Sequence, residues 1–269
     1  MKTRIISGIV MGLIVAAVLV TGAYVPAVVT VFIALLSGVA VYELVHTAAG
    51  IKDTASVVAA TLFGVFAVLG FGDPFGLRIP NLILWLAVIY FLIVVVLCLK
   101  NHGSFSLSHL AVLCAMPLPV AFAFSCLGRV INGADGYYYL LLLFNFSSVC
   151  DMGAYFVGVT CGKHKLCPEI SPKKTVEGLL GGFASSLLVA VILCLSFGFN
   201  DRLVKTLLLT VPFCAVGVCG DLFASVIKRT VGIKDYGRLI PGHGGVLDRV
   251  DSILLIAPLL WLCVEAGLL

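Results

Sequence analysis

The chain has 269 residues, of which 61% are hydrophobic and 11% are charged, and its formal net charge is +4. An average soluble domain is roughly 45–50% apolar and about 25% charged, so this composition excludes a water-soluble globular protein and an intrinsically disordered one. The small, dispersed positive charge indicates no nucleic-acid partner, and a polytopic membrane protein is the class that remains.

Nine apolar segments are long enough to cross a membrane. A transmembrane helix needs about 20 mainly apolar residues to cross ~30 Å of hydrocarbon. By this measure the predicted spans, in chain order, are 5–23, 25–45, 55–72, 80–99, 108–128, 137–160, 179–199, 203–227 and 251–268. Pro117 and Pro119 interrupt the fifth of them, and Asp151 lies inside the sixth. We therefore predict an all-α, polytopic membrane helix bundle of about nine transmembrane helices.

The first predicted span follows Lys2 and Arg4, so it could also be a secretory signal that is cleaved after Ala23. We favour a retained helix, because the later spans hold the chain in the membrane in either case. The sequence shows no internal repeat and no long soluble insertion, so we expect a single integral membrane domain over residues 1–269. Within it, residues 1–136 are expected to form lipid-facing scaffold helices and residues 137–269 the catalytic half.

The basic residues are distributed unequally between the two sides of this bundle. Of the 17 Lys and Arg residues, four lie in loops of one side, namely Arg78, Arg129, Arg202 and Lys205, which leaves 13 on the side of the amino terminus. Cytoplasmic loops carry an excess of Lys and Arg. The sequence therefore predicts a cytoplasmic amino terminus and an external carboxyl terminus.

Two predicted cytoplasmic stretches, 160–178 and 228–250, hold nine of the 17 basic residues. Each follows a predicted span that contains a carboxylate, Asp151 in the first case and Asp221 in the second. An acid inside the hydrocarbon region is costly and usually faces the bundle interior or a water-filled cavity. We therefore expect an active site at the cytoplasmic face of the bundle.

The run from Asp221 to Asp251 has the residue types of a divalent-metal site. On a helix, Asp221, Ser225, Lys228 and Arg229 lie along one stripe. Asp248 and Asp251 follow a glycine-rich segment, and Mg²⁺ usually takes one or two carboxylates together with substrate phosphates. The glycines would let backbone N–H groups approach phosphate oxygens. Helix capping is the alternative for Asp248 and Asp251, but it leaves the buried Asp221 unexplained.

The earlier run, from Asp151 to Gly178, is compatible with phosphate binding. Asp151, Ala154 and Gly158 share a helix face that allows close packing or a cavity beside the acid. Ser171-Pro172 predicts a helix start, which would place 173–175 near the positive end of a helix dipole. The alternative is a capped helix whose lysines contact anionic lipids.

Other polar residues carry weaker signals. Glu43 and His46, near the cytoplasmic end of the second span, are interpreted as an interfacial polar pair. No Gly-x-Ser-x-Gly, Walker A or His-Glu-x-x-His pattern occurs, so the sequence lacks the marks of α/β-hydrolases, P-loop nucleotidases and zinc proteases.

Both runs resemble motifs of one enzyme family, the phosphatidate cytidylyltransferases or CDP-diacylglycerol synthases. The carboxyl-terminal motif is represented by Ser225, Ile227-Lys228-Arg229, Lys234-Asp235, Gly237, Ile240-Pro241, His243-Gly244-Gly245, Asp248-Arg249 and Asp251. The second motif is represented by Asp151, Ala154-Tyr155, Gly158, Gly162-Lys163, Ser171-Pro172-Lys173-Lys174-Thr175 and Glu177-Gly178. The resemblance covers roughly residues 145–260, and the first half matches only as apolar spans.

The resemblance implies that CMP is transferred from CTP to phosphatidate, which gives CDP-diacylglycerol and pyrophosphate in phospholipid biosynthesis. It also implies Mg²⁺ as the cofactor, a homodimer, and a place in the bacterial inner (plasma) membrane. Phosphatidate is already largely ionised near neutral pH, since the second pKa of a phosphomonoester is about 6. Catalysis would then consist of positioning two polyanions and neutralising their charge.

The resemblance also suggests roles for individual residues. The expected metal ligands are Asp221 and Asp248, with Asp251 as a third or outer ligand and Asp151 as an extra metal or ribose contact. The expected catalytic group comprises Lys228 and Arg229 on a substrate phosphate, His243 on the triphosphate, and the metal-binding Asp248. The expected substrate contacts are Lys173, Lys174, Thr175, Ser225, Lys234, Gly244, Gly245 and Arg249.

Two other functions remain open from the sequence. A related polyprenol or phytol kinase would share the helix bundle, the metal and the cations, but it would need a base for its alcohol substrate. A membrane transporter would distribute charged residues over both halves of the bundle and often shows a repeat. The pattern of CDP-alcohol phosphotransferases is absent, because Asp135-Gly136 is followed by three tyrosines.

Overall fold

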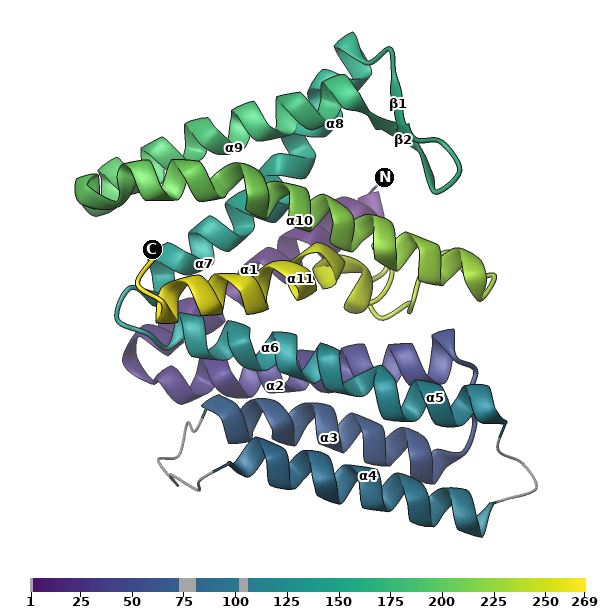
Figure 1. Ribbon diagram of the computed structural model, residues 1–269. Helices are drawn as coiled ribbons and strands as arrows, with labels where there is room; N and C mark the ends of the chain where they lie inside the picture. Colours follow the sequence, from purple (N-terminus) through teal and green to yellow (C-terminus); the bar gives the residue numbers. More distant parts are fainter. Residues whose placement is uncertain (1, 73–80, 102–105) are drawn as a thin grey trace. The chain divides into compact units, whose positions relative to one another are not determined.

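A computed structural model describes residues 2–72, 81–101 and 106–269. Its helices are α1 (Lys2–Tyr24), α2 (Pro26–Tyr42), α3 (Thr54–Gly72), α4 (Leu82–Lys100), α5 (Leu107–Ala115), α6 (Pro117–Ile131), α7 (Gly136–Phe144), α8 (Cys150–Cys161), α9 (Val176–Phe197), α10 (Leu203–Thr230) and α11 (Leu247–Glu265) (Figure 1). Two π-helical segments, η1 (Glu43–Ala48) and η2 (Asn145–Val149), and one 3₁₀ turn, η3 (Asn200–Arg202), extend some of them. The strands β1 (Lys165–Cys167) and β2 (Ser171–Thr175) form one hairpin.

The prediction of a polytopic membrane helix bundle is confirmed. Within the described part of the chain, eight helical stretches are long and apolar enough to span a membrane, and they run from Ile6–Tyr24 to Asn200–Thr230. The ninth predicted span corresponds to α11, whose first turns carry Asp248, Arg249 and Asp251. Arg78, one of the four basic residues assigned to the external side, lies outside the described residues.

Two of the predicted spans are interrupted where the sequence suggested an irregularity. The fifth is divided at Met116 into α5 and α6, because Pro117 has no N–H to donate and is favoured in the first turn of a new helix. The sixth consists of α7, η2 and α8, and the π-helical turn η2 directly precedes the helix that carries Asp151. Such π-helical insertions are frequent at functional sites.

The structure corrects the expected helix start at Ser171-Pro172. Residues Ser171–Thr175 form the strand β2, which pairs antiparallel with β1, so Lys165 lies opposite Thr175. Helix α9 begins only at Val176, and the buried Thr175 is its N-cap, since its hydroxyl oxygen accepts the N–H of Gly178 at 3.1 Å. Lys173 and Lys174 therefore lie on a strand and not in the first turn of a helix.

The chain divides into two compact units, and the division is not a single cut in the sequence. The first unit comprises Met1–Asn132 and Val231–Val250, and the second comprises Gly133–Thr230 and Asp251–Leu269. The boundary between Val250 and Asp251 falls inside α11. The first unit thus combines the amino-terminal helices with the glycine-rich segment, which is far away in sequence.

In the first unit, α2, α3 and α6 pack against one another, while α4 contacts α3 and α1 contacts α2 (Figure 1). The core between them is apolar and includes Ala34, Val41, Ala67 and Phe124. Large apolar side chains such as Leu84 are exposed on the outer face. Exposed apolar surface of this kind is typical of contact with a membrane.

In the second unit, α9 packs along α8 and also contacts α7 and α10. The α8 face with Ala154 and Gly158 lies directly on α9, and a Cβ at Gly178 would meet the carbonyl oxygen of Ala154 at 2.7 Å. Of the two expectations for this face, close packing is therefore the one that the structure confirms.

Candidate functional site

Three acids and two lysines meet in the second unit, and we call them the acid–lysine cluster: Asp151 on α8, Lys174 on β2, Asp221 and Lys228 on α10, and Asp251 on α11. The Nζ atom of Lys174 lies 2.7 Å from Oδ2 of Asp221, and Nζ of Lys228 lies 4.0 Å from Oδ2 of Asp251. The charge of Asp221 also acts on the carboxylates of Asp151 and Asp251. Asp151 is exposed and the other two acids are partly exposed. Carboxylates that repel one another are stabilised by cations close by.

The close approach of α10 and α11 brings two of these acids together. A Cβ at Gly220 would lie 2.8 Å from the carbonyl oxygen of Asp251 and 3.1 Å from Cα of Ser252. Only a glycine allows the two helix backbones to come this close. Asp221 directly follows this glycine, so its position relative to Asp251 depends on the crossing.

The hairpin that carries Lys174 is tied to the start of α9. The carboxylate of Glu177 accepts the N–H of Lys163 at 3.0 Å and lies 2.6 Å from Nδ1 of His164. The N–H of Val176 donates to the carbonyl oxygen of His164 at 2.9 Å. These contacts fix both ends of the hairpin and hold Lys174 near α10.

The glycine-rich segment belongs to the first unit, and we call residues 231–246 the glycine loop. Ile240 and Gly244 exchange backbone hydrogen bonds of 2.9 and 3.1 Å around Pro241-Gly242, and the φ angles of Gly242 and Gly244 are 78° and 91°. These angles lie in the left-handed region, which residues with a Cβ rarely adopt. The glycines therefore form a tight turn.

The backbone N–H groups at the tip of this loop are engaged within it. His243 and Gly244 both donate to the carbonyl oxygen of Ile240, and Gly245 donates to Oδ2 of Asp248 at 3.0 Å. We had expected the glycine N–H groups to approach phosphate oxygens. In this structure they donate within the loop and stabilise it. The substrate contacts of Gly244 and Gly245 stay a prediction.

His243 and Asp248 are both held by hydrogen bonds. The hydroxyl of Ser7 on α1 donates to the carbonyl oxygen of Pro241 and lies 2.9 Å from Nδ1 of His243. The hydroxyl has a single proton, so when it donates to Pro241 the Nδ1–H group of His243 is the donor in the second contact. Asp248 is 8% exposed, and its Oδ2 also accepts the N–H of Tyr236 at 2.8 Å.

The remaining predicted contacts lie on the same elements. Ser225 and Arg229 lie on α10, Lys173 lies on β2, Lys234 lies in the glycine loop, and Arg249 lies in the first turn of α11. The hydroxyl of Thr175 caps α9 and is buried there, and its substrate contact stays a prediction.

Among the described residues, no three His, Cys, Asp or Glu side chains are arranged so that they could hold a metal ion. The donor chemistry of the acid–lysine cluster nevertheless suits Mg²⁺, which prefers oxygen and is commonly held by one or two carboxylates together with substrate phosphates and water.

Sequence reasoning missed Glu43. It was interpreted as part of an interfacial pair, but its side chain is 3% exposed and accepts backbone hydrogen bonds from Val246 and Leu247. His46 is separate from it, since its Nδ1 lies 3.1 Å from the carbonyl oxygen of Ile51 and its ring stacks on Tyr42. The signal that could have identified Glu43 is an acid within an apolar span, as for Asp151 and Asp221.

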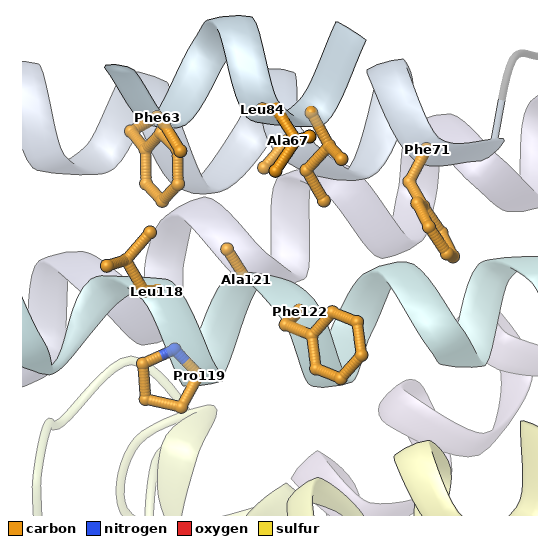
Figure 2. Close-up of a pocket in the computed structure, with 10 residues that line it drawn as sticks. Phe63, Ala67, Phe71, Leu84, Leu118, Pro119, Ala121 and Phe122 are labelled. Carbon is orange, nitrogen blue, oxygen red and sulfur yellow. The ribbon is translucent and has the colours of Figure 1, made fainter. Parts of the chain in front are cut away.

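A cavity of about 390 Å³ in the first unit is no candidate for this chemistry. Figure 2 shows that side chains of α3, α4 and α6 line it, among them Phe63, Leu84 and Phe122. All of its lining residues are apolar. Such a lining suits hydrocarbon and offers no group for a phosphate.

Comparisons with known proteins agree with the motifs. Residues 2–266 match the model of the cytidylyltransferase family. The chain is 40% identical over 161 residues to a phosphatidate cytidylyltransferase of Staphylococcus haemolyticus, over 60% of each chain. It is 46% identical over 127 residues to one of Staphylococcus saprophyticus, over 47% of this chain and 49% of that one. These matches thus span about half to three fifths of the relatives' own length.

Proposed function

This chain belongs to the cytidylyltransferase family, as its motifs predicted, and on that premise we propose that it transfers CMP from CTP to phosphatidate and releases pyrophosphate. The relatives that carry the name phosphatidate cytidylyltransferase support this proposal. The observation that carries it is the acid–lysine cluster, because carboxylates paired with lysines suit the binding of phosphate groups together with a divalent cation.

The proposed reaction needs little acid–base chemistry from the protein. An oxygen of the phosphatidate phosphate forms a bond to the α-phosphorus of CTP, and the bond from that phosphorus to the β-phosphate bridging oxygen breaks. Phosphatidate attacks as an anion that is already ionised near neutral pH, so no general base is required. The protein has to align two polyanions and neutralise their charge in the transition state.

The ion pairs of the cluster suggest how substrate phosphates bind, namely by exchange with the carboxylates that pair with the two lysines. A phosphate that enters beside Lys174 can replace Asp221 as the partner of its ammonium group, since both anions form charge-assisted contacts of similar geometry. Lys228 can exchange Asp251 for a phosphate in the same way. The carboxylates thereby released are the residues that would hold Mg²⁺.

Asp221 and Asp251 would be the primary holders of the metal, with Asp151 nearby. A metal-binding role of Asp248 stays a prediction from the sequence. When bound, Mg²⁺ supplies positive charge to the phosphate oxygens of CTP. Arg229 and His243 are proposed to contact substrate phosphates, and Lys173, Ser225, Lys234 and Arg249 to support binding.

The protein lies in a membrane, and we propose which membrane and which orientation. The apolar helices make the chain an integral membrane protein, and the relatives named above are bacterial. We propose an inner (plasma) membrane location, with the amino terminus and the site on the cytoplasmic side, because Lys and Arg gather there. A homodimer is proposed from the family alone.

One assay tests the proposed function. The purified full chain is incubated with CTP labelled at the α-phosphate, with phosphatidate, and with Mg²⁺. We expect labelled CDP-diacylglycerol and an equal amount of pyrophosphate, and a chelator should abolish both until Mg²⁺ is restored. Transfer of the γ-phosphate of CTP to a lipid alcohol, or substrate transport without a product, would contradict the proposal.

A further inference from the structure

Glu43 lies at the junction of α2 and η1, yet its contacts are with residues about 200 positions later. One carboxylate oxygen accepts the N–H of Val246 at 3.1 Å, and the other accepts the N–H of Leu247 at 2.9 Å. Both bonds are buried, and Leu247 is the first residue of α11. Glu43 therefore caps α11 from another helix of the same unit.

The two ends of the glycine loop pass directly against this carboxylate. A Cβ at Gly237 or at Gly245 would overlap an oxygen of Glu43. The carboxylate thus occupies the space between the segment that enters the loop tip and the segment that leaves it. A smaller side chain at position 43 would leave this space empty, and a larger residue at 237 or 245 would not fit.

Asp248 holds the same loop from the other side. It accepts the N–H groups of Tyr236 and Gly245, while Glu43 accepts those of Val246 and Leu247. The two buried acids repel each other, and these four N–H donors compensate the repulsion. Two buried carboxylates that repel each other are a costly way to fix a loop, which indicates that the geometry of the loop matters.

We propose that Glu43 is a positioning residue for the nucleotidyl transfer, one that fixes the glycine loop so that His243 and Asp248 meet the substrate in a single geometry. This inference rests on the proposed function. Glu43 itself touches no substrate, because its carboxylate is buried behind the loop backbone. Loss of its two hydrogen bonds would leave the loop ends free to shift, and a displacement of about 1 Å at a reacting group can cost roughly 100-fold in rate.

The first test compares E43Q with a matched control, D53N. Asp53 belongs to the same unit and also caps a helix, since its carboxylate accepts the N–H of Ser56 at 2.9 Å at the start of α3. We expect E43Q to lower kcat by roughly 10- to 100-fold. E43Q and D53N should lower the thermal midpoint of unfolding by similar amounts, but kcat of D53N should stay at the wild-type value. E43D keeps the carboxylate and should recover part of the kcat that E43Q loses.

A double-mutant cycle tests the contact directly. G245A places a methyl group against the Glu43 carboxylate, and that obstacle is absent when position 43 is alanine. We expect G245A to reduce kcat in the wild-type background and to have little further effect in E43A. Additive effects of the two substitutions, or an E43Q variant with wild-type kcat, would overturn the inference.

A measurement without substrate tests the inference even if the proposed activity is absent or the variants are unstable. Amide hydrogen exchange of Val246 and Leu247 in E43Q reports the loop without any substrate, and it should accelerate relative to D53N. Unchanged exchange in E43Q contradicts the positioning role. A wild-type protein that makes no CDP-diacylglycerol contradicts the proposed function instead, whatever the exchange shows.

Discussion

At the scale of single residues, four acids have partners that account for their positions. Asp221 faces Lys174, Asp251 faces Lys228, and Glu43 and Asp248 accept backbone N–H groups. Removing one member of such an arrangement leaves the other charge or donor uncompensated in a low-dielectric environment, which is more costly than losing the pair. The consequences of substitutions should therefore differ between these acids.

Asp221→Asn should reduce turnover at least 100-fold, as expected when a charged ligand of substrate or metal is lost. The amide keeps the shape of the side chain but can neither balance Lys174 nor offer a second anionic oxygen. Asp201→Asn, on the exposed turn η3 of the same unit, is the control and should retain full activity. CDP-diacylglycerol formation by equal amounts of purified protein measures both, and near-normal turnover of Asp221→Asn would remove Asp221 from the site.

At the scale of elements, hydropathy and helix signals predicted most of the bundle but failed at residues 171–175. Ser171-Pro172 has the local chemistry of a helix start, whereas the observed strand depends on pairing with Lys165–Cys167. The partner strand ends only four residues before Ser171, but strands this short have no run of alternating apolar and polar residues, so periodicity does not reveal the hairpin. The true helix start had its own signal, Thr175 as the N-cap and Glu177 in the first turn.

The crossing of α10 and α11 yields a prediction about an element contact. Gly220→Ala puts a methyl group 2.8 Å from the backbone oxygen of Asp251, so the helices must separate. We expect a loss of about 1–3 kcal/mol in stability and roughly a tenfold loss of turnover, because Asp221 and Asp251 shift apart. Thermal unfolding and product formation are the measurements.

Gly12→Ala on α1 is the matched control for this substitution, since a Cβ there meets nothing within 4 Å. Alanine is the better helix former, so this variant should be as stable as the wild type or slightly more stable. If Gly220→Ala behaves like Gly12→Ala, the close crossing does not position the two acids.

At the scale of the whole molecule, the two compact units do not follow the order of the chain. The sequence predicts a single domain with a scaffold half over 1–136 and a catalytic half over 137–269, and these roles stay a prediction. Val231–Val250 packs with the amino-terminal helices, and α11 continues into the second unit. Contacts of Ser7 on α1 and of Glu43, within an apolar span, join the early and late segments of the first unit. Composition and periodicity depend on residues that are close along the chain, so they cannot predict such a long-range contact.

The orientation of the whole molecule in the membrane can be tested with a thiol reagent that cannot cross the membrane. Cys161 is exposed at the end of α8, beside the basic hairpin that we place on the cytoplasmic side. A cysteine introduced as Asn200→Cys lies at the other end of α9 and should face outward. Intact cells should label position 200 and spare Cys161, whereas inside-out vesicles should show the reverse.

The measurement uses variants that each keep one cysteine, with the others replaced, and such a variant also provides the control. A chain that retains only Cys194, which is buried in the second unit, should remain unlabelled from either side. Labelling of Cys161 in intact cells would invert the orientation and would place the acid–lysine cluster on the external side, away from cytoplasmic CTP. The excess of 13 basic residues over four would then need another explanation, because the positive-inside preference counts Lys and Arg in the short loops that this chain has.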